Sequence, residues 1–162
     1  MKCLATILLT LALTANAETI TGLVVGIADG DTLTVLDADK VQHKIRLAGI
    51  DAPEKKQPFG NSSRESLSEL VFDKPVEVVT SKNDRYGRKI GKVLVKGQDV
   101  NLAQVKRGMA WVYRKYQHEQ SYNDQREYEV AEDAAKAGKR GLWLDVASVE
   151  PWAFRHTKVR SD

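Results

Sequence analysis

The first half of the chain contains short runs of β-branched and apolar residues that are separated by turn residues. Residues 32–36 alternate polar and apolar side chains, which is the pattern of a strand that buries one face. Asp29–Gly30 precedes this run and is typical of a hairpin turn. Five strands are predicted, over residues 20–27, 32–36, 41–50, 75–80 and 90–95. This series of strands constrains the fold more than any other feature of the sequence.

Helical patterns interrupt the strands once and then follow them. Ser62-x-x-Glu65 has the spacing of a capping box, and an apolar stripe of helical period follows it to Val71. After the last strand, a short helix is predicted to end at Gly108 and a longer one to cover residues 122–137. This order does not fit alternating strand–helix units with a parallel sheet. It predicts an α+β protein with an OB-fold, a five-stranded antiparallel β-barrel with about three helices packed on it.

Length and composition fit one globular domain. The chain has 162 residues, of which 42% are hydrophobic and 29% charged, and these fractions exclude wholesale disorder and a long coiled coil. The single cysteine excludes an internal disulfide framework and a cysteine-rich zinc site. The formal net charge is +3, from 25 Lys and Arg against 22 Asp and Glu. This weak excess allows an anionic partner but does not identify one.

Residues 1–17 have the features of a secretory signal peptide. Lys2 lies ahead of an apolar run, and Ala15-Asn16-Ala17 has the form of a cleavage site. The run is shorter than the roughly 20 residues that a membrane span needs. A buried N-terminal helix is the alternative, but no polar face accompanies the apolar residues. We therefore expect export to the periplasm or the medium, with no membrane association after cleavage.

The rest of the chain is expected to form one domain over residues 18–145 and a basic tail over residues 146–162 that packs on the domain or trails from it. Pro151 and the three residues after it are compatible with one more helical turn. Arg155, Lys158 and Arg160 make the tail basic. Chain termini are mostly solvated, so we expect a solvated tail rather than a phosphate-binding one.

Carboxylates lie at two predicted strand ends, beside turns. Asp29 and Asp31 flank Gly30, and Asp51 and Glu54 belong to one short loop. Clusters of oxygen donors suit a hard cation such as Ca²⁺. Each motif alone is also ordinary turn chemistry, because Asp and Gly favour turns for backbone reasons. The carboxylates are therefore candidate metal ligands, with a structural role as the alternative.

Two arginines accompany these carboxylates. Arg46 lies between two apolar residues of the third predicted strand, and Arg88 precedes the fifth. A guanidinium group can hold a phosphate through two parallel hydrogen bonds. The alternative is an isolated surface ion pair, which contributes little. Two arginines, a cation site and a further carboxylate are together the groups that phosphodiester hydrolysis requires.

These motifs resemble those of the thermonuclease, or staphylococcal nuclease-like, family, as it occurs in exported bacterial proteins. The resemblance rests on four segments in the family's order, at residues 29–32, 46–47, 51–54 and 84–88. Segments 101–116 and 131–143 resemble the later helices of the family. The resemblance thus covers nearly all of the chain after residue 17. It implies the family's fold and Ca²⁺-dependent hydrolysis of phosphodiester bonds in DNA and RNA, which leaves 3′-phosphate ends.

The resemblance also implies roles for particular residues. It assigns the cation to Asp31, Asp51 and the backbone carbonyl of Ala52. It assigns catalysis to Glu54 as general base and to Arg46 and Arg88 as the groups that stabilise the phosphate. The family often has Thr where Ala52 stands, but a backbone carbonyl does not depend on the side chain.

Substrate contacts are implied for Arg85 and Tyr86, and for either Tyr113 or Tyr116. Arg85 replaces a lysine that is common in the family and keeps its charge. We expect a monomer that binds DNA and RNA without sequence preference. The alternative function is a non-catalytic nucleic-acid-binding module on the same fold, but such modules typically lack part of the carboxylate and arginine set.

Overall fold

The computed structural model describes residues 17–159, so the predicted signal peptide lies outside the described residues except for Ala17. Six strands form one sheet in the order β3-β2-β1-β5-β6-β7. Their bounds are Glu18–Ile27 for β1, Thr32–Leu36 for β2, Gln42–Leu47 for β3, Pro75–Asn83 for β5, Lys89–Val95 for β6 and Gln98–Asp99 for β7. A further pairing of β3 with β6 closes the first five of these strands into a barrel. The predicted OB-type barrel is confirmed.

The pair of strands that closes the barrel is parallel, with Arg46 of β3 beside Ile90 of β6. The other neighbouring pairs in this sheet are antiparallel. The predicted antiparallel barrel is confirmed for these pairs, and the closing pair of β3 and β6 departs from it. A helix and β5 lie between β3 and β6 in the chain, and this long connection lets the two strands run in the same direction.

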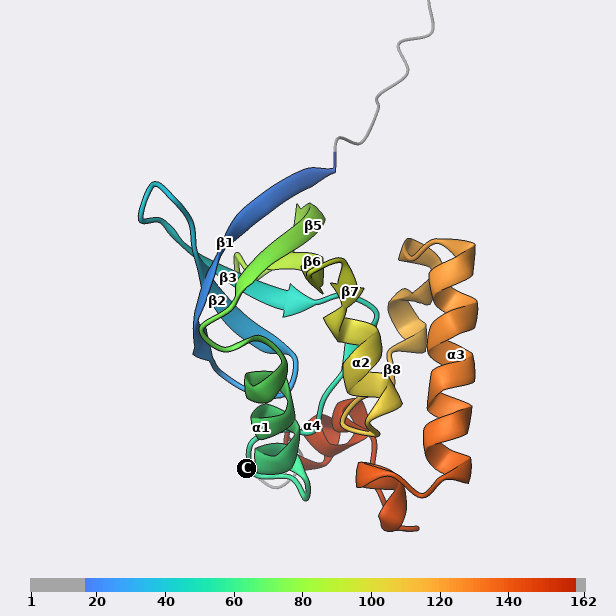
Figure 1. The fold of residues 1–162 in the computed structure, drawn as a ribbon. Coiled ribbons are helices and arrows are strands. Elements are labelled where there is room, and N and C mark those ends of the chain that lie inside the picture. The colour runs from blue at the N-terminus through green and yellow to red at the C-terminus, as the bar shows by residue number, and fades with distance from the viewer. Residues whose placement is uncertain (1–16, 160–162) are drawn as a thin grey trace, which may run out of the picture.

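The helices gather on one side of the barrel (Figure 1). Within residues 17–159, the α-helices are α1 (Gly60–Val71), α2 (Val100–Lys106), α3 (Tyr122–Ala137) and α4 (Pro151–Val159). Two 3₁₀-helices, η1 (Arg114–Glu119) and η2 (Gly141–Leu144), join them. The first three α-helices correspond to the three that the sequence predicts. The fourth, α4, lies in the predicted tail. It has 9 residues and is longer than the single helical turn expected there.

The predicted strand over residues 41–50 is divided in the structure. β3 ends at Leu47, and β4 (Ile50–Asp51) leaves the barrel to pair with β8 (Trp111–Val112). Gly49 makes this change of direction possible with a φ of 73°, which glycine adopts without strain. Because of this turn, Asp51 is placed beside Trp111 rather than at the end of a barrel strand.

The predicted capping box is wrong. α1 begins at Gly60, and its N-cap Phe59 has a φ of 64° and makes no side-chain capping hydrogen bond. The chain turns tightly here, and a Cβ on Gly60 would lie 2.2 Å from the carbonyl oxygen of Glu54. This close approach requires glycine at residue 60, and the helix begins there without a capping side chain.

The core lies inside the barrel and under α1 and α2. Alternate residues of β2 and β3 are buried, with Leu33 and Val35 on one strand and Ile45 and Leu47 on the other. Arg46 lies between the last two, so it faces the opposite side of the sheet. Within residues 17–159, no helix is both long and apolar enough to cross a membrane.

A buried carboxylate on α3 supports the strand pair that carries Asp51. Glu132 is fully buried and accepts hydrogen bonds from the backbone N–H of Val112 (2.9 Å), Arg114 Nη2 (2.7 Å) and Lys136 Nζ (2.8 Å). Val112 belongs to β8, which pairs with β4. Burial raises the pKa of Glu132, but these hydrogen bonds outweigh burial and leave the pKa below its usual value. Glu132 therefore stabilises the segment beneath Asp51 as an anion.

Replacing Glu132 with Gln is expected to lower the free energy of unfolding at pH 7 by about 1–3 kcal/mol, because two charge-assisted hydrogen bonds are lost. A carboxylate that is more acidic in the folded state stabilises the fold above its unfolded pKa, near 4.5, and this contribution disappears as pH falls through the folded pKa. The difference between wild type and Glu132→Gln should therefore shrink at pH 3.5. Urea unfolding at pH 7 and pH 3.5 measures this difference in the free energy of unfolding, and Glu127→Gln at an exposed position of α3 is the control. An equal difference at the two pH values would contradict the role of Glu132 as a stabilising anion.

Candidate active site

Arg46 joins the two predicted metal carboxylates. Its Nη2 lies 2.8 Å from Asp51 Oδ1 and 3.0 Å from Asp31 Oδ2. Its Nη1 donates to the backbone carbonyls of Leu47 (2.7 Å) and Ile50 (2.8 Å), which hold the guanidinium in the turn between β3 and β4. The side chains of Asp31 and Asp51 are almost fully buried. Three strand ends thus converge on one buried cluster of charges.

Asp31 is held in place by its neighbours. Its Oδ2 accepts a hydrogen bond from the backbone N–H of Ala52 (2.6 Å), and its Oδ1 accepts one from Thr32 Oγ1 (3.1 Å). Burial raises the pKa of Asp31 to about 7, and the Arg46 guanidinium offsets only part of this effect. The preceding Gly30 packs so closely that a Cβ would lie 1.8 Å from Ser63 Oγ. Glycine is therefore required for Asp31 to approach Ala52.

The second predicted arginine enters the same site from the start of β6. Arg88 Nε donates to Asp84 Oδ2 (2.7 Å), and Arg88 Nη1 donates to Thr32 Oγ1 (3.3 Å). Asp84 Oδ1 accepts from the backbone N–H groups of Tyr86 and Arg88, which closes the loop. Although burial raises the pKa of Asp84, these hydrogen bonds from Arg88 and the backbone lower it overall. An ionised Asp84 therefore orients the Arg88 guanidinium.

An arginine that sequence reasoning did not assign to the site lies on the predicted catalytic carboxylate. Arg155 of α4 donates from Nη1 to Glu54 Oε1 (2.8 Å) and from Nη2 to Asp51 Oδ2 (2.7 Å). The expectation of a solvated tail is therefore wrong for Arg155. Pro151, the first residue of α4, is a signal for a helix start. Local sequence carries no signal that Arg155 contacts a residue 104 positions earlier in the chain.

Aromatic side chains line the same region. Tyr86 is 69% exposed, and Arg85 Nη2 donates to its hydroxyl (2.6 Å). Tyr113 stacks on Trp152 with ring centroids 5.5 Å apart and an interplanar angle of 9°. Tyr116 meets Tyr113 edge to face at 5.0 Å. Both candidate tyrosines thus belong to one aromatic cluster, and the geometry does not select between them.

One cleft of about 720 Å³ contains every residue to which the sequence assigns a role. These residues are Asp31, Arg46, Asp51, Ala52, Glu54, Arg85, Tyr86, Arg88, Tyr113 and Tyr116. Trp152 and Arg155 of α4 line it as well. The structure therefore brings the predicted residues together, and their individual roles stay predictions.

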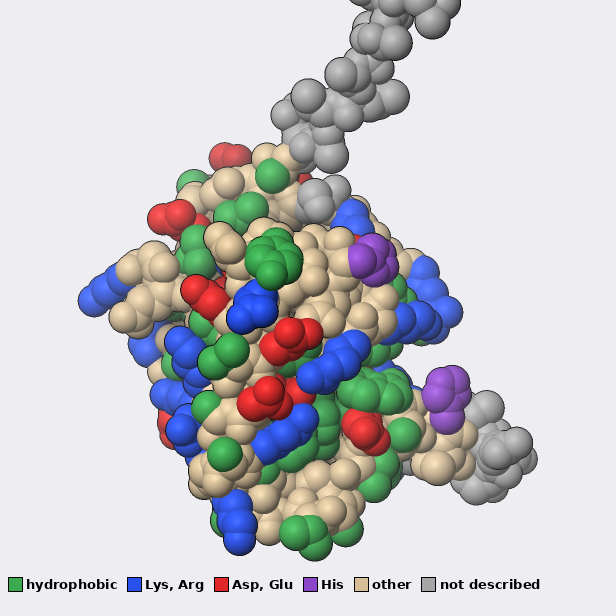
Figure 2. All heavy atoms as spheres, turned by 90° about the vertical axis from the view of Figure 1, so that its right-hand side faces the viewer, with side chains coloured by type: hydrophobic (Ala, Val, Ile, Leu, Met, Phe, Trp, Pro, Cys, Tyr) green, Lys and Arg blue, Asp and Glu red, His purple; other side chains and the backbone are tan. Residues whose placement is uncertain are grey.

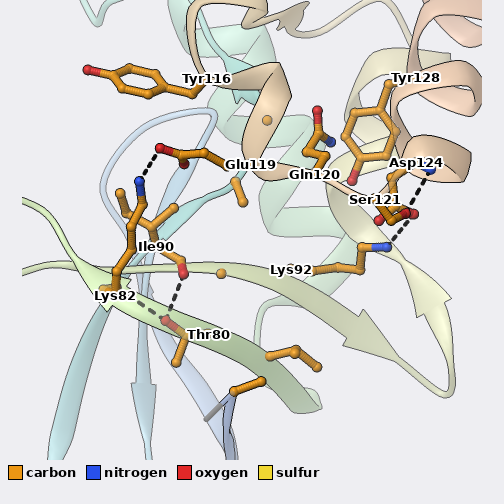
Figure 3. Close-up of a pocket in the computed structure, with 15 residues that line it drawn as sticks. Thr80, Lys82, Ile90, Lys92, Tyr116, Glu119, Gln120, Ser121, Asp124 and Tyr128 are labelled. Carbon is orange, nitrogen blue, oxygen red and sulfur yellow. Dashed lines mark hydrogen bonds and ion pairs between the residues drawn. The ribbon is translucent and has the colours of Figure 1, made fainter. Parts of the chain in front are cut away.

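A second hollow of about 580 Å³ lies beside this cleft (Figure 3). Two ion pairs cross it, Lys82 with Glu119 and Lys92 with Asp124. The figure shows each lysine directed at its carboxylate partner. None of the residues to which the sequence assigns catalysis or a metal lines this hollow, so the cleft that holds Arg46 and Arg88 is the candidate active site.

The outer surface beside α3 carries charges of both signs. Figure 2 shows Lys and Arg side chains next to Asp and Glu side chains across this face. Such mixing agrees with the weak net charge of +3. Recognition of an anion is therefore better explained by the arginines inside the cleft than by the face that the figure presents.

The predicted metal ligands are of the chemical type that a hard cation prefers. Among residues 17–159, no three His, Cys, Asp or Glu side chains are grouped so that they could hold a metal. The predicted set does not require three, because it combines two carboxylates with the backbone carbonyl of Ala52. All of these donors are oxygens, which Ca²⁺ and Mg²⁺ prefer and which argue against zinc. In this structure, Arg46 and Arg155 contact the same Asp51 carboxylate that a cation would use.

Comparison with known proteins agrees with the fold and the site. Residues 44–145 match the family described as staphylococcal nuclease homologues. The chain is 44% identical over 132 residues to an uncharacterized endonuclease of Haemophilus influenzae, covering 82% of this chain and 71% of that protein. It is 39% identical over 143 residues to a micrococcal nuclease of Shigella flexneri, covering 83% and 79%. The chain belongs to the staphylococcal nuclease family, and the prediction of a nuclease-type hydrolase is confirmed.

Proposed function

We propose that the chain is a Ca²⁺-dependent nuclease that hydrolyses phosphodiester bonds in DNA and RNA without sequence preference and leaves 3′-phosphate ends. One observation carries this proposal: Arg46 bridges Asp31 and Asp51, with Glu54 and Arg88 in the same cleft. Relatives named endonuclease and micrococcal nuclease support it. The proposal includes a monomeric protein that is exported through residues 1–17.

The proposed chemistry assigns one task to each group. Asp31, Asp51 and the carbonyl of Ala52 would hold the cation, which would supply Lewis-acid chemistry and positive charge opposite the phosphate. Glu54 is 39% exposed and lies at the open side of the cluster, where it accepts a proton from the attacking water. Arg46 and Arg88 bind the phosphate oxygens and stabilise the charge that develops in the transition state.

Removal of the cation tests the proposal directly. The purified protein is incubated with double-stranded DNA, single-stranded DNA and RNA, in excess EGTA and then with Ca²⁺ restored. We expect activity to be abolished by EGTA and recovered with Ca²⁺, because the proposed ligands are oxygens that bind phosphate only through a cation. Mass spectrometry of the fragments identifies the phosphate-bearing end.

Two outcomes would contradict the proposal. Full activity in EGTA, with metal removal confirmed by elemental analysis, would exclude a cation-dependent mechanism. Retention of labelled oligonucleotides without cleavage at any Ca²⁺ concentration would favour the binding module instead.

A further inference from the structure

Helix α4 lies beyond the part of the chain that matches the family of staphylococcal nuclease homologues, which ends at residue 145. Trp152 and Arg155 are three positions apart on this helix, so their side chains project from one face. Both side chains line the cleft that holds Glu54 and Asp51. The helix therefore directs one aromatic group and one cation at the site from the end of the chain.

Arg155 binds two carboxylates at once. Nη1 lies 2.8 Å from Glu54 Oε1 and 3.3 Å from Asp51 Oδ1, while Nη2 lies 2.7 Å from Asp51 Oδ2. Asp51 is buried and fixed by Arg46, whereas the Glu54 side chain is 39% exposed. A planar guanidinium with two such contacts sets the distance and orientation between its partners. Arg155 thus connects Glu54, whose side chain is long and partly exposed, to Asp51, whose side chain is buried and held by Arg46.

The start of α4 is attached to the loop that carries Glu54. Gln57 is buried and donates from Nε2 to the carbonyl oxygen of Val149, just before the helix. Its Oε1 accepts a hydrogen bond from the backbone N–H of Glu54 (3.1 Å). At the other side of the cleft, Trp152 stacks on Tyr113. These contacts fix the position of α4 relative to both the carboxylates and the aromatic cluster.

We propose that Arg155 is a further arginine of the active site, a positioning residue that holds the Glu54 carboxylate beside Asp51. This inference rests on the proposed function, because it assigns a role relative to Glu54 as general base. A glutamate side chain that is free to rotate loses part of its effectiveness, since catalytic groups need a narrow range of positions. Helix α4 is accordingly a wall of the site and not a trailing tail.

The position of Arg155 has a second consequence, for cation binding. Nη2 occupies Asp51 Oδ2, one of the oxygens available to the cation, and places a positive charge there. Removing this charge should strengthen binding of Ca²⁺, because like charges at short distance repel. The same change should slow catalysis, because Glu54 loses the group that orients it. Tighter Ca²⁺ binding together with slower catalysis is a combination that a purely structural role for Arg155 does not produce.

Three full-length variants test the proposal: Arg155→Gln, Arg155→Lys and, as a control that removes an exposed arginine on α3, Arg126→Gln. Calorimetric titration with Ca²⁺ measures cation affinity without reference to activity, and initial rates on single-stranded DNA give kcat and KM. For Arg155→Gln we expect kcat to fall about tenfold or more, with a smaller change in KM, and Ca²⁺ to bind at least about threefold more tightly. Arg126→Gln should match wild type in both.

Arg155→Lys keeps the charge but can contact only one carboxylate at a time. Its Ca²⁺ affinity should therefore stay near that of wild type while kcat recovers in part. Circular dichroism melting confirms that the variants are folded, and the lysine variant serves as the test if Arg155→Gln does not fold.

Unchanged or increased kcat in the folded variants would overturn the proposal, and an increase would make α4 an inhibitory strap. Unchanged Ca²⁺ affinity in Arg155→Gln would also overturn it, because Arg155 would then not lie at the cation site. Failure of the proposed function is recognised separately, since wild type itself would then cleave no substrate at any Ca²⁺ concentration.

Discussion

Replacing Glu54 with Gln is expected to reduce kcat by roughly 10²–10⁴-fold, which is the usual contribution of a general base. The amide is similar in size and cannot accept the proton of the attacking water. Its oxygen can still accept the hydrogen bond from Arg155 Nη1, and the backbone of residue 54 stays bound to Gln57. Stability and KM should therefore change little, whereas Ca²⁺ should bind somewhat more weakly, because a negative charge close to Asp51 is lost. Steady-state kinetics on single-stranded DNA and calorimetric titration with Ca²⁺ provide these measurements.

Glu65→Gln is the matched control for this experiment. Glu65 is an exposed glutamate on α1, so the same substitution there changes the net charge without changing the cleft. Hydrolysis at the wild-type rate in Glu54→Gln would remove Glu54 from the catalytic role. The cation and the arginines would then have to activate water without a side-chain base.

Replacing Arg88 with Lys is expected to lower kcat/KM by roughly 10²–10³-fold, the effect of removing one donor that stabilises transition-state charge. Arg88 uses Nε to bind Asp84 and directs the rest of its guanidinium toward Thr32 and the cleft. A lysine ammonium at this position would pair with Asp84 and would not reach the phosphate at the same time. Because the positive charge is conserved, any loss of kcat/KM measures the contribution of the guanidinium's geometry and not of electrostatic attraction alone.

Arg64→Lys, on the exposed side of α1, is the control for this substitution. Rates across a range of salt concentrations separate the effect of guanidinium geometry from that of electrostatic attraction, because attraction to the phosphate backbone weakens steeply with salt. If Arg88→Lys retained wild-type kcat/KM at every salt concentration, Arg88 would be no more than a point charge in the cleft.

Much of the barrel could be predicted from the sequence because strand alternation and turn residues are local signals. Residues 32–36 alternate as expected, and the structure has β2 over the same residues. The division of the predicted strand over residues 41–50 was not predictable, because it depends on pairing of β4 with β8, which lies some 60 positions later. The parallel closure of β3 on β6 depends on the course of the whole connection between them.

The candidate site likewise contains residues that local sequence could indicate and one that only tertiary packing brings in. Asp31, Arg46, Asp51 and Glu54 lie within a short stretch of sequence. Their residue types at strand ends and beside turns made them candidates, and the resemblance to the nuclease family gave them their roles. Arg155 could not be selected in this way, since a basic residue near a terminus is usually solvated. Only the packing of α4 across the cleft brings it to Asp51 and Glu54.

The amino-acid sequence by itself determined most of the barrel strands and their turns, the class of fold and the chemical types of the groups that converge, because these follow largely from residues close together in the chain. The tertiary structure alone decided which charges meet. It placed Arg46 between two buried carboxylates, stacked Tyr113 on Trp152 and brought Arg155 onto Glu54. The physical reason is that hydrogen bonds and ion pairs depend on distances of a few ångströms, which only long-range packing sets.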